Sequence, residues 1–311
     1  MNYSIKKYEN MKKLELTNEE LLAELKRRFD LNNSMLMAEK SLTTQLNAVN
    51  EKLIFSEDLK TNFLSNIRNE INNPIASILE LSKNILEGNM DTDSMKRFGM
   101  LIHSEAFDLD FQFKNIFLSA DIEAGESPLS VISVNVGSIL NNIISSFSYR
   151  MEKKKINVSF DNQIDSKAFF HTDSEKFHLI MSNLLANAIT FNREGGSIKI
   201  IAKIEDDQLI ISVQDTGISI SDKNKERIYD RFLQLDSGSV KTYGGHGLGL
   251  TVTKAMLEII QGEISLDTEE GIGSKFMVTI NQFKNIGEGS GISSTDGNDF
   301  LFGQEEDGML F

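Results

Sequence analysis

Four glycines precede an apolar, helix-like run in the stretch Lys241-Thr-Tyr-Gly-Gly-His-Gly-Leu-Gly-Leu250. Because glycine has no Cβ atom, its backbone N–H can approach an anion closely. A glycine-rich turn that opens a helix also presents the positive end of the helix dipole, which favours phosphate. A glycine run alone is more often a flexible loop, so a phosphate site needs support from the rest of the chain.

A helix is predicted upstream over residues 174–191, where apolar side chains recur at a 3.6-residue period. Asn183 and Asn187 are four positions apart in this segment and therefore share one face. A solvated helix edge would also explain two neighbouring amides. In a metal site, the carbonyl oxygen of one asparagine would bind Mg²⁺, and phosphates and water would complete the coordination.

A buried strand is predicted over residues 208–214, which are apolar and β-branched. Asp215-Thr-Gly217 follows it directly. An aspartate at a strand end can accept a hydrogen bond from the exocyclic amine of adenine, and Gly217 leaves room for a flat base. In isolation, this tripeptide would be an ordinary turn.

Two further pieces complete the pattern, a short amphipathic turn at Ile228–Phe232 and a final strand over residues 276–280. Five pieces in this order are far more specific than any one of them. Together, residues 129–283 resemble the ATP-binding domain of sensor histidine kinases, in the superfamily that includes gyrase and certain chaperones. The family's motifs appear in order as Asn183-Leu-Leu-Ala-Asn187-Ala, Asp215-Thr-Gly217-Ile-Ser219-Ile, Ile228–Phe232 and Gly245-His-Gly247-Leu-Gly249-Leu.

This resemblance implies that ATP and Mg²⁺ are the cofactors, with Asn187 on Mg²⁺ and Asp215 on adenine. It also implies a two-layer α/β sandwich with a mobile lid near residues 218–246. The other implied cofactor-binding residues are Asn183, Gly217, Lys241, Gly245, Gly247, Leu248 and Gly249.

Three positions depart from the family's pattern. Ser219 stands where a second glycine is usual, Thr190 where a lysine is frequent, and His246 where a small residue is common. The loss of a lysine near phosphates removes a charge contact. We expect ATP binding to survive, because the implied Mg²⁺ ligand and adenine acceptor are both present.

Residues 63–75 resemble the family's phosphoacceptor segment, but Asn69 occupies the position of the phosphoacceptor histidine. An imidazole nitrogen is a nucleophile whose proton a neighbouring carboxylate can take. An amide nitrogen attacks phosphorus poorly, because its lone pair is delocalised into the carbonyl group. Glu70 remains as a possible base, but it has no ring proton to accept. His103 is an alternative acceptor, although a lone histidine on a helix is usually structural or solvated.

The segment around Asn69 resembles the family's dimerisation hairpin, with a turn over residues 87–93 and a second helix over residues 104–125. Pro74 removes a backbone donor from the first helix and should kink it. Two such hairpins form a four-helix bundle with short loops, so a dimer is expected.

A seven-residue grid of apolar side chains precedes the hairpin, within residues 8–60. It predicts a coiled-coil stalk, although a single amphipathic helix packed on its own chain is the alternative. The grid is interrupted at Arg28, Asn32 and Glu39. Its members are Leu14, Leu21, Met35, Leu42 and Val49, with Leu25, Leu46 and Leu53 four positions after three of them.

The predicted fold class is therefore α+β, with an N-terminal coiled coil and a two-helix hairpin followed by a two-layer α/β sandwich. The predicted segments are a stalk (1–55), the hairpin (56–126), the ATP-binding domain (127–284) and a disordered acidic tail (285–311). The tail carries Phe300-Leu-Phe302 and Met309-Leu-Phe311, which would either dock on a partner or belong to a merely solubilising segment.

Composition limits the remaining functions of this 311-residue chain. The net charge of −14 and the pI of about 4.8 disfavour nucleic-acid binding. The sequence has no cysteine, which suits a reducing cytoplasm. It shows no apolar run of membrane-spanning length and no signal peptide, so we expect a cytoplasmic protein that receives its input without a membrane span.

Three functions remain open. The first is a signalling protein of a two-component or phosphorelay system that binds Mg-ATP but does not phosphorylate itself at the usual position, and acts as a regulatory or scaffold pseudokinase. The second is an active kinase that phosphorylates a histidine on a partner. The third is a nucleotide-independent interaction protein. The expected partners are a second copy or a related kinase, and a response regulator or phosphotransfer protein.

Overall fold

The structure, a computed structural model, describes residues 18–88, 91–231, 233, 247–269 and 271–283. It divides the chain into two compact units, residues 1–61 and 62–311. Three groups of predictions lie outside the described residues. They concern the first 17 residues, the acidic tail, and the part of the lid that contains Lys241, Gly245 and His246.

The described part of the chain begins with two long helices, α2 (Asn18–Leu86) and α3 (Thr92–Ala124). Helix α2 continues through Pro74 to Leu86, so the proline does not end it. Helix α3 begins twelve residues earlier than the predicted start at 104, because the Asp91 side chain caps it by accepting the backbone N–H of Ser94. No helix in the described part of the chain has an apolar stretch suited to crossing a membrane.

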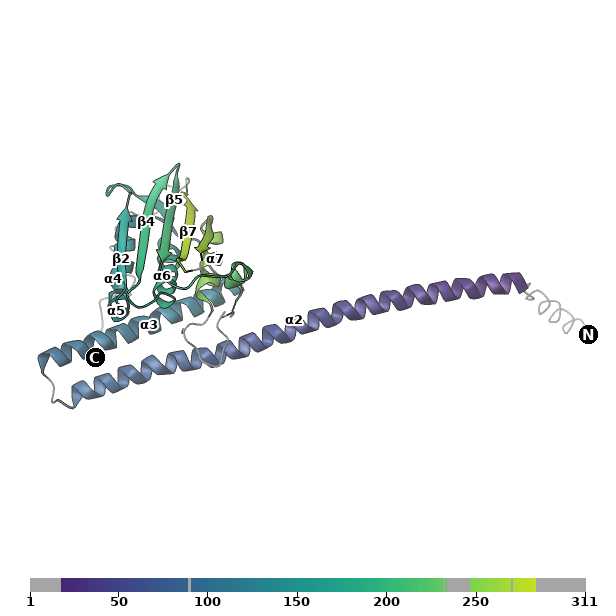
Figure 1. Cartoon of the computed structure of the whole chain (residues 1–311), viewed down its shortest axis with the longest axis horizontal. Coiled ribbons are helices and arrows are strands. Elements are labelled where there is room, and N and C mark those ends of the chain that lie inside the picture. Colours follow the sequence, from purple (N-terminus) through teal and green to yellow (C-terminus); the bar gives the residue numbers. More distant parts are fainter. Residues whose placement is uncertain (1–17, 89–90, 232, 234–246, 270, 284–311) are drawn as a thin grey trace, which may run out of the picture. The chain divides into compact units, whose positions relative to one another are not determined.

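A five-stranded sheet forms one layer of the α/β domain (Figure 1). The β2–β4 pair is parallel and the other pairs are antiparallel. In spatial order the strands are β2 (Asn157–Asn162), β4 (Ser197–Glu205), β5 (Gln208–Asp215), β7 (Gly273–Asn281) and β6 (Gly262–Glu269). A separate antiparallel pair is formed by β1 (Val131–Val134) and β3 (Phe170–Asp173).

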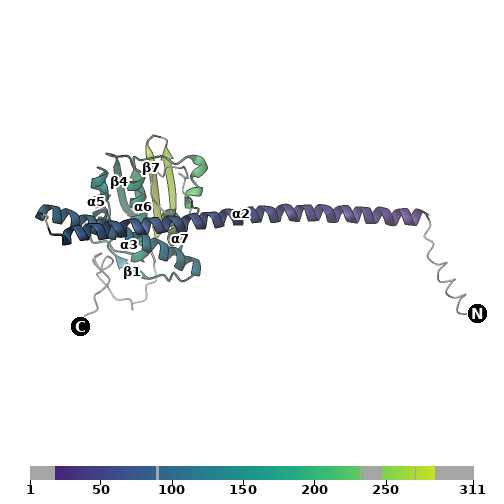
Figure 2. The ribbon, with the colours of Figure 1, turned by 90° about the horizontal axis from the view of Figure 1, so that it is seen from below.

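Helices pack on one face of this sheet (Figures 1 and 2). The helix predicted over 174–191 is α6, and the strand predicted over 208–214 is β5, so both predictions are confirmed. Short 3₁₀ helices η2 (Asp222–Asn224) and η3 (Arg227–Tyr229) follow β5. Among the described residues, the α-helices of the domain are α4 (Val136–Ser146), α5 (Ser148–Lys153), α6 (Ser174–Thr190) and α7 (Gly249–Ile259).

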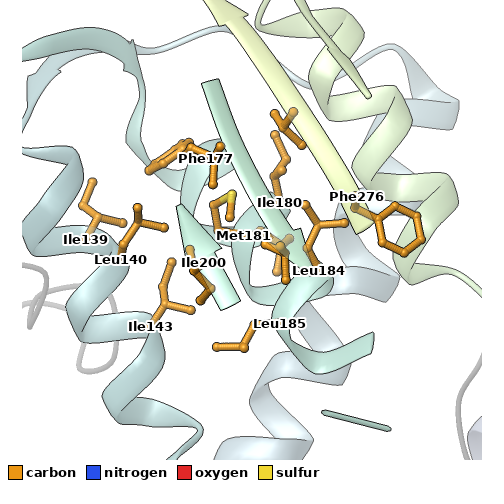
Figure 3. Packing of buried hydrophobic residues seen from close by; sticks show 14 of the residues in the cluster. Ile139, Leu140, Ile143, Phe177, Ile180, Met181, Leu184, Leu185, Ile200 and Phe276 are labelled. Atoms are coloured by element: carbon orange, nitrogen blue, oxygen red, sulfur yellow. The ribbon is translucent and has the colours of Figure 1, made fainter. Parts of the chain in front are cut away.

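The hydrophobic core lies between α4, α6 and the sheet (Figure 3). Alternate side chains of the central strands point into it, because a strand turns successive residues to opposite faces. Full burial of one such aliphatic or aromatic side chain stabilises the fold by about 1.5–3 kcal/mol. The layered arrangement confirms the predicted α+β class.

Candidate functional site

Asp215 ends β5 and is only 5% exposed. Its carboxylate accepts the backbone N–H of Gly217 at 2.8 Å. Burial disfavours the charged form and raises the pKa of Asp215 to about 6, while hydrogen bonds from the backbones of Gly217 and Ser274 oppose that rise. The strand end thus holds a fixed acceptor, as adenine recognition requires.

Hydrogen bonds with the Asn192 side chain and the Ser197 backbone fix the turn after Asp215. The Thr216 hydroxyl donates to Asn192 Oδ1 at 3.1 Å and accepts the backbone N–H of Ser197 at 2.9 Å. Asn192 is 1% exposed and donates back to the Ser197 carbonyl. Sequence reasoning missed Asn192 and Thr216. The sequence signal that could have found them is the pair Gly195-Gly196 soon after Asn192, since a Cβ at Gly196 would collide with Asn192 Oδ1.

Two glycines allow the backbone to close around this turn. A Cβ at Gly217 would collide with the carbonyl oxygen of Phe191, and the backbone N–H of Ile218 donates to that same oxygen at 3.0 Å. A Cβ at Gly273 (φ 130°) would collide with the Asp215 carbonyl oxygen. Gly217 therefore has a packing role at the end of α6, in addition to the predicted role beside a base.

Helix α6 connects this turn to the start of α7. Asn183 is 3% exposed, and its amide donates to Asn115 Oδ1 of α3 at 2.7 Å. Asn187, one turn further on, is half-buried. The two asparagines therefore differ in their surroundings, since Asn183 is buried against α3 and Asn187 is partly exposed.

Two glycines of the predicted phosphate turn, Gly247 and Gly249, lie in the described residues at the start of α7. Gly247 has φ 68°, a left-handed conformation that favours glycine. The Leu248 side chain is buried in the core, so only its backbone is available to a ligand. The N-cap residue, Leu248, makes no side-chain hydrogen bond to the first turn of α7, and a Cβ on Gly249 would lie 3.2 Å from Asn183 Oδ1. A helix start of this kind is suited to phosphate.

The segment predicted as an amphipathic turn contacts α7 and α3. The Thr251 hydroxyl donates to the Tyr229 carbonyl at 3.0 Å, and Lys254 Nζ lies 5.3 Å from the centre of the Tyr229 ring. Arg231 forms an ion pair with Glu123 near the end of α3. Within the predicted lid, the described segment around Tyr229 and Arg231 therefore contacts both α7 and α3.

The predicted phosphoacceptor position, residue 69, lies on α2, where Asn69 is exposed and Glu70 is half-buried. His103, the alternative acceptor, is exposed on α3. Among the described residues, no cluster of three histidine, cysteine or acidic side chains could hold a metal ion. The predicted Mg²⁺ ligand is the amide oxygen of Asn187, which is half-buried.

The residues present fit Mg-ATP. Three kinds of group suit this ligand: a buried acceptor at Asp215, a half-buried amide oxygen at Asn187, and a glycine-containing start of α7 where the N-cap Leu248 makes no side-chain cap. Helix α6 contacts both the proposed phosphate region and the proposed adenine region. Asn183 lies beside the start of α7, and Phe191, which caps α6, lies beside Gly217.

Comparison with known proteins identifies relatives among histidine kinases. Residues 172–283 match the family described as histidine kinase-, DNA gyrase B- and HSP90-like ATPase. The autoinducer 2 sensor kinase/phosphatase LuxQ of Vibrio vulnificus is 31% identical over 254 residues, which are 80% of this chain and 30% of LuxQ. The circadian input-output histidine kinase CikA of Synechococcus elongatus is 28% identical over 71% of this chain and 30% of CikA.

Among solved structures, full-length ShkA in complex with AMPPNP has a TM-score of 0.51 and 21% identity, over 74% of this chain and 47% of ShkA. That likeness supports the fold. The chain spans about a third of the length of the curated relatives named above.

Proposed function

The chain belongs to the sensor histidine kinase family, with an ATP-binding domain of the gyrase and Hsp90 type, and we propose that it is a regulatory or scaffold member of a phosphorelay. In this role it binds Mg-ATP but does not phosphorylate its own residue 69. The curated relatives are kinases by name, so the proposed difference depends on this chain's own residues.

Asn69 is the observation that carries the proposal. It is exposed on α2 next to Glu70, in the position where the family's phosphoacceptor histidine is expected. A carboxylate can activate an imidazole by taking its proton, but it cannot make an amide nitrogen a comparable nucleophile. The site therefore has its base but lacks its acceptor.

The nucleotide site supports retained Mg-ATP binding. Asp215 would accept the adenine amine, Asn187 would offer its oxygen to Mg²⁺, and the α7 start would bind phosphate through backbone N–H groups. Bound Mg²⁺ would neutralise phosphate charge. A domain that no longer served a nucleotide would gain nothing from burying a carboxylate at Asp215, which argues against a purely nucleotide-independent role.

An active kinase that phosphorylates a histidine of a partner is the second candidate. The retained site favours it, because phosphoryl transfer depends mainly on positioning and electrostatic stabilisation. In either role, a response regulator or phosphotransfer protein is the proposed partner and the cytoplasm the proposed compartment.

A dimer is proposed from the surface of α2. Its apolar grid is exposed within one chain, with Leu42 at 67% and Leu46 at 68%. A long helix with such a row gains stability by packing against a second copy as a coiled coil. A homodimer and a heterodimer with a related kinase both satisfy this requirement.

The test combines calorimetry with phosphorylation of the full chain. We expect wild-type protein to bind Mg-ATP and to gain no acid-labile label from γ-labelled ATP. Asn69→His should gain label, and Asn69→His combined with Glu70→Gln should lose most of it. Asn69→Gln is the matched control without a nucleophile.

Three results would count against the proposal. Absence of Mg-ATP binding would exclude the nucleotide role, and phosphate on residue 69 of the wild-type chain would exclude the missing acceptor. Label on a partner's histidine, supplied by the wild-type chain, would favour the second candidate instead.

A further inference from the structure

A buried hydrogen bond joins α3 to the motif helix α6. Asn183 Nδ2 donates to Asn115 Oδ1 at 2.7 Å, across 68 residues of sequence, and both side chains are less than a tenth exposed. Asn115 lies outside the ATP-binding motifs, on the second helix of the predicted hairpin, so the nucleotide-site role proposed above does not explain it.

The orientation of both amides follows from one further contact. Asn115 Nδ2 donates to the Phe111 carbonyl of its own helix at 2.9 Å, which turns its Oδ1 toward Asn183. Because that oxygen only accepts, Asn183 has to present its Nδ2 to α3. The Asn183 oxygen therefore faces the start of α7, where a Cβ on Gly249 would lie 3.2 Å from it.

Other contacts hold Asn115 at this place. Phe107 and Phe111 of α3 pack edge-on against Phe147, with ring centres 5.2 and 5.8 Å away. Asp108 forms an ion pair with Arg150 of α5 at 2.5 Å. These contacts lie one and two turns before Asn115 on α3, so they fix the helix face that contacts α6.

We propose that Asn115 is a positioning residue for the nucleotide site, acting through Asn183; this inference rests on the function proposed above. Asn115 holds the Asn183 oxygen toward the α7 start. An amide oxygen can bind Mg²⁺ or accept hydrogen bonds from its water shell, but it repels a phosphate without metal. Asn115 therefore favours binding of a metal-bound nucleotide. Without Asn115 the amide can turn over, since its terminal torsion is two-fold. The contact with α3 thereby affects nucleotide affinity.

The test is a double-mutant cycle in the full chain, with a non-hydrolysable ATP analogue titrated in Mg²⁺ or in EDTA. We expect Asn115→Ala to weaken the Mg²⁺-dependent affinity about five- to tenfold, which is the scale of one hydrogen bond. Affinity in EDTA and affinity for adenosine should stay unchanged. In an Asn183→Ala background, Asn115→Ala should have no further effect.

Ser119→Ala is the matched control, because Ser119 is also buried on α3, one turn after Asn115. It should leave every affinity unchanged, and circular dichroism should show that all variants fold. Three results would overturn this inference without affecting the proposed function. The Mg²⁺-dependent affinity could be unchanged in Asn115→Ala, or the affinity for adenosine could fall equally. Asn115→Ala could also weaken binding as much in the Asn183→Ala background as in wild type. If the wild-type chain binds no nucleotide, the proposed function fails as well.

Discussion

Asp215 and Gly217 are joined by a hydrogen bond of 2.8 Å, in which the Gly217 backbone N–H donates to the Asp215 carboxylate. Burial raises the pKa of this carboxyl to about 6, against the opposing effect of the backbone donors. The group proposed to bind adenine therefore changes its charge under mildly acidic conditions.

Adenosine affinity should decrease as the pH falls below about 6, because protonation of Asp215 removes the anionic acceptor for the adenine amine. Adenosine is a suitable probe, since it has no phosphate that titrates in this range. Ligand-observed NMR from about pH 5 to about pH 8 would give the profile. Asp215→Asn should bind more weakly at neutral pH and show a flat profile, and an equally flat wild-type profile would contradict the assignment.

The same carboxyl should lower the stability of the ligand-free protein at neutral pH. Its pKa is above the unfolded value of 3.8, so the folded state retains a proton that the unfolded chain releases. The destabilisation grows as the pH rises from about 4 to about 6 and is complete above that range.

Asp215→Asn should accordingly raise the free energy of unfolding at neutral pH by about 1–2 kcal/mol, which corresponds to several degrees in melting temperature. It should have little effect near pH 4. Thermal unfolding by circular dichroism at both pH values would measure this difference. A variant that is less stable than wild type at neutral pH would show that hydrogen bonds to the carboxylate outweigh its burial.

Gly217→Ala tests the close approach of the Asp215 turn to α6. The new Cβ would collide with the Phe191 carbonyl oxygen, so the backbone has to move at a cost of about 1–3 kcal/mol. Gly99→Ala is the control, because a Cβ at that position of α3 meets nothing within 4 Å and alanine favours a helix. Urea unfolding should separate the two variants, and equal stabilities would contradict the packing role.

Local patterns predicted the elements that position the site. The 3.6-residue period of α6 placed Asn183 and Asn187, and the apolar run of β5 placed Asp215, because these signals depend only on neighbouring residues. The start of α3 was predicted too late, since the cap formed by Asp91 and Ser94 lies in a polar stretch without a clear period.

Contacts between distant segments could not be predicted in this way. Asn115 meets Asn183 across 68 residues, and Thr216 meets Asn192 across 24. The strand order β2-β4-β5-β7-β6 likewise depends on pairings that no local pattern encodes. The sequence therefore suggested candidate side chains such as Asn183 and Asp215, whereas the fold was needed to show how Asn183 is oriented.

The exposed row on α2 leads to the last prediction. Leu42 is 67% exposed within one chain, so a coiled coil with a second copy would bury it and a charge there would oppose pairing. Leu42→Glu should raise the dimer dissociation constant at least about tenfold, since burial of a leucine contributes about 1.5–3 kcal/mol. Gln45→Glu adds the same charge to the same helix outside the apolar grid and should have little effect. Sedimentation equilibrium would compare the two variants with wild type. A wild-type chain that remains monomeric, or equal effects of the two substitutions, would show that this row does not pair.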